Sequence, residues 1–263
     1  MAQSKDEMSF LEHLEELRWH LIRSLAAILF FAVGGFLFKD FVFDTLILGP
    51  TKDSFWTYRF FCHYTGMLCQ GPGELKIFTK DLGEQFLLHI KVSVVLGFIV
   101  ASPYVFWELW RFIKPGLYDK EQKVAKYFVG ICSSLFMIGI VFGYYIVTPM
   151  AVTFLAKYSL SSTIENSVTL SSLISNLTMI VLPAGLIFEL PLVIYFLAKM
   201  GLVTPEFLKK YRKHALVIIL IVSAIITPPD VVTQLLVTFP LYILYEIGIY
   251  VAKYVIKNSA STE

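Results

Sequence analysis

The amino-acid sequence predicts an all-α polytopic membrane protein that crosses the bilayer six times. Of its 263 residues, 57% are hydrophobic and only 16% are charged, and the mean hydropathy is +0.70. A soluble protein of this length cannot bury so much apolar surface, because a polar shell must cover its core. We predict a single membrane domain over residues 1–258, followed by a short C-terminal tail over residues 259–263.

Six apolar segments account for this composition. The predicted spans are about 21–38, 86–110, 124–147, 173–197, 214–226 and 231–245. A helix needs about 20 apolar residues to cross the hydrocarbon core, and the last two segments reach only about 20 Å at the rise of an α-helix. The sequence TPPD between them favours a tight turn. We therefore predict a short hairpin of two spans in a thinned bilayer, with a re-entrant pair as the alternative.

The distribution of basic residues predicts that both termini face the cytoplasm. Fifteen Lys and Arg residues lie on the side of the termini, whereas six lie on the other side. Cytoplasmic loops are the ones enriched in Lys and Arg. The long first loop then faces outward and carries Cys62 and Cys69. These two cysteines form a disulfide if that compartment is oxidising, and otherwise stay free thiols.

Several functional classes are not indicated. The net charge is only +2 and no basic run occurs, so the sequence does not suggest nucleic-acid binding. It contains no GxxxxGK[ST] nucleotide loop, no HExxH zinc motif and no GxSxG serine elbow. We expect no enzymatic activity, no cofactor and no metal site.

An acidic segment, HLEELRWH, precedes the first span. Glu12 fits a helix-capping box, whereas Glu15 and Glu16 fall with it on the polar face of the helix, opposite an apolar stripe. These carboxylates offer a docking face for a cationic ligand. Alternatively, Glu15 and Glu16 pair within the chain with Arg18 and His20.

A second pair of acids lies in the loop RFIKPGLYDKEQK after the second span. Asp119 and Glu121 interrupt an otherwise basic stretch there. Pairs between a guanidinium and a carboxylate can be bidentate and charge-assisted. Isolated acids on a basic membrane face would therefore suit a cationic peptide.

A third acid, Glu189, lies deep in the fourth span between Pro183 and Pro191. An ionised carboxyl is costly there, so such residues are functional by default. A hydrogen bond to a carbonyl freed by Pro191 is the alternative. Gln234, at the entry of the sixth span, could belong to the same polar patch.

These motifs resemble those of the TatC family, the multispan receptor subunit of the twin-arginine (Sec-independent) protein translocase. The matching segments are HLEELR, FIKPGLYDKE, FELP, TPPDVVTQ and LYEIG, in that order along the chain. The resemblance implies a concave, glove-like bundle of six helices in the bacterial cytoplasmic (inner) membrane. It also implies a receptor for signal peptides with an Arg pair, within a translocase that exports folded proteins using the proton-motive force.

The resemblance also implies roles for individual residues. Glu16 and Glu121 would contact the two arginines, and Phe112 and Pro115 would shape the site. The first motif adds Arg18 and His20, and many relatives have a basic residue such as Arg in place of His20. In this sequence the implied signal-peptide site is Glu16, Arg18, His20, Phe112, Pro115 and Glu121.

The implied partners also include membrane proteins. Glu189 and Gln234 would line the groove where single-span subunits of the TatA/TatB type dock, and other copies of the chain would assemble with it. The alternative is a small proton-coupled secondary transporter that uses Glu189. That function predicts further deep acids and paired repeats, whereas we find one deep acid and no repeat. We therefore favour the receptor.

Overall fold

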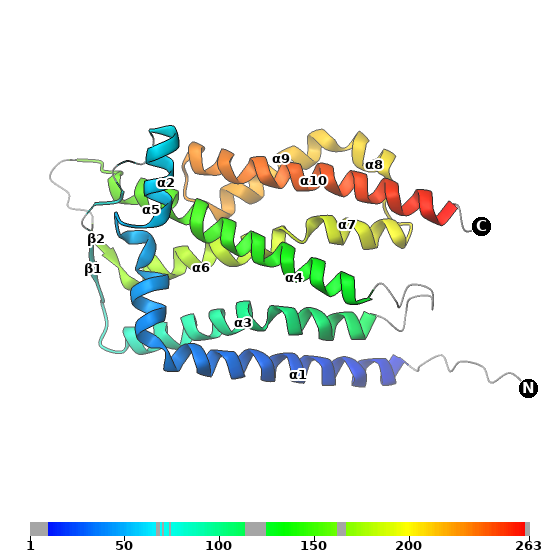
Figure 1. Cartoon of the computed structure of the whole chain (residues 1–263), viewed down its shortest axis with the longest axis horizontal. Coiled ribbons are helices and arrows are strands. Elements are labelled where there is room, and N and C mark those ends of the chain that lie inside the picture. Colours follow the sequence, from blue (N-terminus) through cyan, green and yellow to red (C-terminus); the bar gives the residue numbers. More distant parts are fainter. Residues whose placement is uncertain are drawn as a thin grey trace, which may run out of the picture. The chain divides into compact units, whose positions relative to one another are not determined.

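The computed structural model describes residues 10–66, 69, 71–73, 75–113, 125–161 and 167–260 (Figure 1). Five helices in these ranges are long and apolar enough to cross a membrane: Leu14–Leu37, Glu84–Phe112, Val129–Lys157, Leu170–Lys199 and Val231–Lys257. The predicted all-α polytopic class is confirmed. Contacts divide the chain into two compact units, residues 1–39 with 89–134 and residues 40–88 with 135–263. The glove-like shape that the resemblance implies stays a prediction.

The first unit contains α1 (Phe10–Leu37), most of α3 (Glu84–Ile113) and the start of α4 (Ala125–Phe142). Helices α1 and α3 lie side by side (Figure 1). Their close approach depends on Gly97, because a Cβ atom there would lie 2.5 Å from the Ile28 carbonyl oxygen and 2.7 Å from the Ala32 nitrogen. Small residues at such crossings let membrane helices pack backbone against backbone.

Replacing Gly97 with Ala is expected to destabilise the first unit by about 1–3 kcal/mol, the usual cost of overpacking. The obstructing atoms belong to backbone, so they cannot rotate away. Gly34→Ala is the matched control, because a Cβ atom at Gly34 meets nothing within 4 Å. Thermal unfolding in detergent should show a lower midpoint for Gly97→Ala and an unchanged one for Gly34→Ala. Equal midpoints would contradict this packing.

The second unit contains three short helical elements and two strands outside its long helices. They are the π-helix η1 (Phe41–Ile47), the 3-10 helix η2 (Gly49–Thr51), the helix α2 (Trp56–Thr65), and the strands β1 (Lys76–Phe78) and β2 (Ser167–Thr169). The two strands are parallel, with Ile77 opposite Val168. These elements belong to the outer loops of the predicted topology.

The third predicted span is one continuous helix with a local π-turn. Helix α4 leads through η5 (Gly143–Val147) into α5 (Thr148–Lys157), so the helix runs ten residues beyond the predicted end at Val147. Pro149 has no N–H to give to the carbonyl of Tyr145 four residues earlier. The Thr57 hydroxyl of α2 donates to that carbonyl instead, at 2.5 Å.

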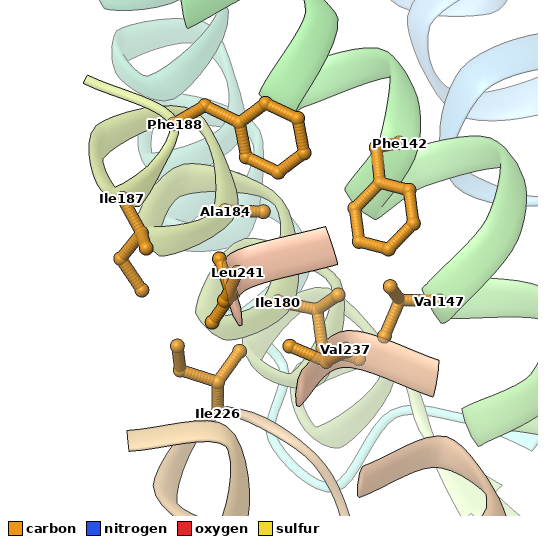
Figure 2. A pocket seen from close by; sticks show the side chains of 9 residues that line it. All are labelled: Phe142, Val147, Ile180, Ala184, Ile187, Phe188, Ile226, Val237 and Leu241. Carbon is orange, nitrogen blue, oxygen red and sulfur yellow. The ribbon is translucent and has the colours of Figure 1, made fainter. Parts of the chain in front are cut away.

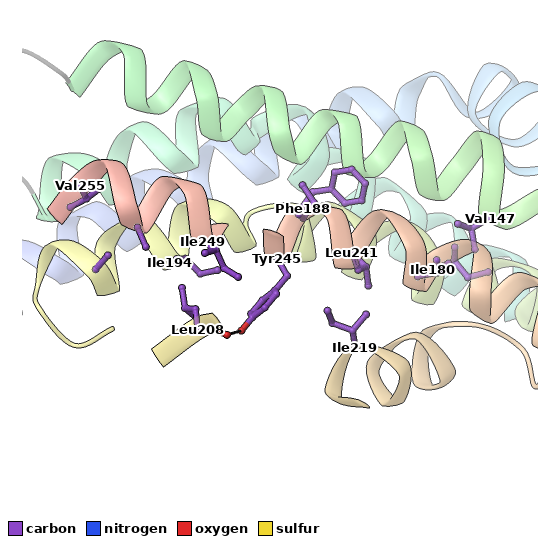
Figure 3. Packing of buried hydrophobic residues seen from close by; sticks show 14 of the residues in the cluster. Val147, Ile180, Phe188, Ile194, Leu208, Ile219, Leu241, Tyr245, Ile249 and Val255 are labelled. Atoms are coloured by element: carbon purple, nitrogen blue, oxygen red, sulfur yellow. Dashed lines mark hydrogen bonds between the residues drawn. The ribbon is translucent and has the colours of Figure 1, made fainter. Parts of the chain in front are cut away.

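The remaining helices form the larger hydrophobic core. They are α6 (Leu170–Ile187), α7 (Leu190–Lys199), α8 (Pro205–Lys210), α9 (Arg212–Ile226) and α10 (Val231–Ala260). Helix α10 packs against α7 and α9, and its buried residues include Leu241, Tyr245 and Ile249 (Figure 3). The Tyr245 hydroxyl donates to the Leu208 carbonyl at 2.8 Å, which ties α8 to α10.

The sixth span differs from its prediction. Helix α9 is short, with 15 residues, as expected, but α10 has 30 residues and continues well past the predicted end at Tyr245. Its buried stripe continues through Ile249, Ala252 and Val255, so the packing face that stabilises the helix does not end at Tyr245. The prediction that both of the last helices are short is therefore wrong for α10.

Candidate functional site

The acidic face of α1 is accessible at Glu15 and Glu16. Glu15 is exposed, and the Glu16 side chain is 37% exposed. One Glu16 oxygen, Oε2, is nevertheless buried without a hydrogen-bond partner among the described residues. A buried oxygen without a donor is energetically unfavourable. Glu16 is therefore a partly exposed carboxylate with one oxygen that lacks a donor among the described residues.

His20 lies one turn further along α1 and is buried. Its Nε2 atom lies 3.8 Å from Oε1 of Glu16, and its Nδ1 atom makes a short hydrogen bond to Oε2 of Glu108 on α3. The in-chain pairing that we left open is therefore found in part. His20 contacts Glu16 but hydrogen-bonds to an acid on another helix.

Glu108 is the centre of a charge cluster in the first unit. Its side chain is buried, while Arg23 approaches Oε2 at 3.9 Å and Arg111 approaches Oε1 at 3.7 Å. Two guanidinium groups and the imidazole of His20 thus surround this carboxylate. Glu108 thus has three basic side chains around it, whereas among the described residues Glu16 has only His20 beside one oxygen and no hydrogen-bond partner for the other.

Glu108 is not among the residues predicted from the sequence. It is a second deep acid, because it lies inside the predicted second span, in the motif WELWRF. An acid within a span, three residues before an Arg, is the signal that could have found it. Its partner His20 is 88 residues away, so the pairing itself is visible only in the fold.

Glu108→Gln is expected to lower the free energy of unfolding by about 2 kcal/mol, within the range for losing a hydrogen bond to a charged group. The buried imidazole of His20 would keep a weaker amide partner. Glu15→Gln, a change of the same chemistry at an exposed site, should have little effect. Chemical denaturation in detergent measures both. A Glu108→Gln protein as stable as the original would show that the cluster does not hold α1 and α3 together.

The other predicted residues of this site are placed as follows. The ring of Phe112 lies edge-on to His20, with centroids 6.2 Å apart. Arg18 is exposed and forms no ion pair with the cluster in the described part of the chain. Pro115 and Glu121 lie outside the described residues. The structure therefore brings Glu16, His20 and Phe112 together and adds Glu108.

Glu189 lies in the turn between α6 and α7, because α6 ends at Ile187 and α7 begins at Leu190. Pro191 cannot donate to the carbonyl of Ile187, so the helix is interrupted there. Glu189 is buried, and both carboxyl oxygens lack a hydrogen-bond partner of normal geometry among the described residues. The backbone of Phe136 on α4 lies beside it.

A small apolar cavity lies beside the turn that carries Glu189. The preceding residue, Phe188, lines a cavity of about 10 Å³ together with Phe142 and Leu241 (Figure 2). All nine side chains that line this cavity are hydrophobic. The lining of this cavity therefore offers no polar side chain beside the turn that carries Glu189.

No hydrogen bond joins Gln234 to Glu189 among the described residues. Its side-chain amide donates to the Leu220 carbonyl at 3.2 Å and so ties α10 to α9. Asp230 accepts from the backbone N–H groups of Val232 and Thr233, at 2.9 and 3.0 Å, and caps α10. Both polar side chains thus have structural partners in the hairpin of α9 and α10.

The loop between the first two predicted spans brings the two cysteines together. Cys62 and Cys69 form a disulfide in the structure, with their Cα atoms 4.5 Å apart. Among the described residues, no group of three or more His, Cys, Asp or Glu could hold a metal ion.

Comparisons with known proteins agree with the geometry. The family of the "Sec-independent protein translocase protein (TatC)" matches residues 12–240. The TatC protein of Blattabacterium sp. subsp. Periplaneta americana is 38% identical, with 98% of this chain and all of the relative covered. That of Desulforapulum autotrophicum is 39% identical, with 100% of this chain and 91% of the relative covered.

A solved structure extends the likeness to three dimensions. The crystal structure of a twin-arginine translocase receptor, TatC, superposes with a TM-score of 0.72 at 35% sequence identity. The match covers 93% of this chain and 100% of that chain. The family match, the full-length relatives and the shared fold lead to one conclusion: this chain belongs to the TatC family of bacterial multi-pass membrane proteins and is a non-enzymatic receptor and core subunit of the twin-arginine translocase.

Proposed function

We propose that the carboxylate of Glu16 binds a guanidinium group of a twin-arginine signal peptide. The observation that carries this proposal is the contrast between two neighbouring acids. Glu108 is surrounded by His20 and two arginines, whereas Glu16 keeps one oxygen without a partner among the described residues. An arginine of the peptide could donate two parallel hydrogen bonds to Glu16.

The other residues of the site have supporting roles in this proposal. Glu108 holds His20 beside Glu16, and the ring of Phe112 covers one edge of His20. Glu121, Pro115 and Arg18 complete the site by resemblance to the family. Both termini and this site face the cytoplasm, in keeping with the excess of basic residues on that side.

We further propose that Glu189 is the docking point for a single-span partner helix of the TatA/TatB type. A polar side chain from that helix would satisfy the buried carboxyl, which neither lipid nor the apolar neighbours can do. Gln234, in the hairpin of α9 and α10, would line the same docking groove. Assembly with further copies of the chain and use of the proton-motive force remain predictions from the family.

Photo-crosslinking tests where the signal peptide binds. A photoreactive residue replaces Trp19, which is 53% exposed and one turn from Glu16. The control places it at Leu160, which is 83% exposed and lies in an outer loop of the proposed topology. An Arg-Arg peptide should crosslink at position 19 and not at position 160, and a Lys-Lys peptide should crosslink less. Equal crosslinking at the two positions would contradict the proposed site.

A further inference from the structure

Helix α2, in the first outer loop, carries a row of exposed aromatic side chains. Trp56, Phe60 and Tyr64 follow one another at intervals of four residues, so they share one face of the helix. They are 54%, 42% and 72% exposed. Their rings form a ladder, with centroids 4.9 Å apart between Trp56 and Phe60 and 4.8 Å apart between Phe60 and Tyr64.

We propose that this aromatic ladder binds the headgroup region of the outer leaflet of the bilayer, so that α2 is an interfacial anchor. Amphipathic aromatic rings favour the membrane–water interface. A helix with one apolar face can lie in that plane. The proposal concerns a surface that the signal-peptide and docking sites do not use.

The opposite face of α2 fixes its orientation. Thr57 and Tyr58 are buried, and their hydroxyls donate to the carbonyls of Tyr145 and Pro50, at 2.5 and 2.7 Å. Burial raises the pKa of Tyr58 to about 12, so its hydroxyl keeps its proton. The helix is therefore attached through one face, and the aromatic ladder lies on a face that stays partly exposed.

The position of α2 along the third span places the ladder beside the bilayer. The Trp56 ring lies 6.2 Å from the ring of Tyr145, which is itself partly exposed on that span. Tyr145 lies twelve residues before Lys157, the end of α5, which corresponds to about 18 Å of helix. Figure 1 shows α2 running across, rather than along, α6 and α10. The ladder is thus continuous with the lipid-facing surface of a span.

The charged neighbours of the aromatic ladder and a nearby disulfide also favour binding to lipid headgroups. Arg59 and His63 are exposed and flank the ladder, where a cation can contact lipid phosphate. The helix ends at Gly66, whose φ of 67° is the left-handed conformation of a helix C-terminus. The disulfide between Cys62 and Cys69 closes this end and fixes the last turn.

Depth-dependent fluorescence quenching tests the proposal. Trp19, Trp107 and Trp110 are replaced by Phe, which leaves Trp56 as the single tryptophan of the full chain. The protein is placed in vesicles of phosphatidylcholine and phosphatidylglycerol. These vesicles carry a nitroxide either near the headgroup or near the bilayer centre. We expect Trp56 to lose more emission to the shallow nitroxide than to the deep one, and little to aqueous iodide.

The matched control moves the tryptophan to the tip of α5. In this protein Trp56 is also replaced by Phe, and Tyr158→Trp introduces the probe at a site that is 58% exposed. We expect quenching of Trp56 by the shallow nitroxide to exceed that of the control about twofold or more, with the opposite order for iodide. Iodide quenching of Trp56 equal to the control would overturn the proposal. So would protection from both quenchers, because it would indicate a protein partner.

A second measurement avoids the three Trp→Phe substitutions, in case the substituted protein does not fold. Incorporation of 5-fluorotryptophan into the otherwise unchanged protein labels its four tryptophans. The Trp56 resonance is identified by its loss in Trp56→Phe. Broadening of this resonance by the shallow nitroxide lipid supports the proposal, and its absence overturns it.

Discussion

Replacing Glu16 with Gln is expected to weaken the binding of a twin-arginine signal peptide about ten- to a hundredfold. The change keeps the shape of the side chain but removes the charge that a guanidinium needs. A hydrogen bond between charged partners contributes about 1.5–3 kcal/mol, and each 1.4 kcal/mol corresponds to about a factor of ten in affinity. Titration of a fluorescent peptide against the protein in lipid nanodiscs gives the dissociation constant.

The chain supplies its own control for this experiment. Glu15 is the neighbouring residue and is exposed, so Glu15→Gln removes the same charge from the same turn of α1. If the effect is specific, Glu15→Gln should change the affinity less than about twofold, in line with the small contribution of exposed charges. Equal losses for the two variants would show that general electrostatic attraction, not a contact with Glu16, retains the peptide.

Replacing Glu189 with Leu is expected to weaken docking of the single-span partner about tenfold while leaving the affinity for the signal peptide unchanged. A hydrogen bond between membrane helices contributes about 1–2 kcal/mol, and Leu cannot form one. Glu189→Gln should keep most of the docking, because its amide can still pair with a polar side chain. Crosslinking of the reconstituted partner and the peptide-binding titration measure the two effects separately.

Leu186→Ala is a suitable control for the docking experiment. Leu186 is 54% exposed and lies one turn before Glu189. Its substitution therefore changes the exposed surface near the site and leaves the carboxyl group of Glu189 in place. It should dock the partner normally. Normal docking by Glu189→Leu would contradict the proposed docking site. A loss of peptide binding in that variant would contradict the proposal that the signal peptide and the partner helix bind at separate sites.

The sequence could predict the spans because each is an apolar run bounded by polar residues. It could not predict where the helices end, since packing decides this. Helix α10 passes Tyr245 because Ile249 and Ala252 continue its buried face. The third span passes Val147 because the hydroxyl of Thr57 accommodates the carbonyl freed by Pro149. That contact joins residues 88 positions apart.

The sequence predicts individual residues of the candidate site but not the contacts between them. Glu16 and Glu189 stand out in the sequence because an acid beside or inside an apolar span is unusual. Glu108 met the same criterion and was overlooked, and its pairing with His20 depends on the crossing of two helices. The prediction that Gln234 lines the same groove as Glu189 stays a prediction. The amide of Gln234 donates to the backbone of α9, a contact that no sequence pattern indicates.

The most direct test of the account compares Arg-Arg and Lys-Lys signal peptides on the unchanged protein and on Glu16→Gln. If Glu16 binds a guanidinium through both of its oxygens, the unchanged protein should prefer the Arg-Arg peptide. In Glu16→Gln that preference should shrink toward equality, because a neutral amide cannot accept the same paired hydrogen bonds. A preference for Arg-Arg that survives the substitution undiminished would show that the arginines are recognised elsewhere.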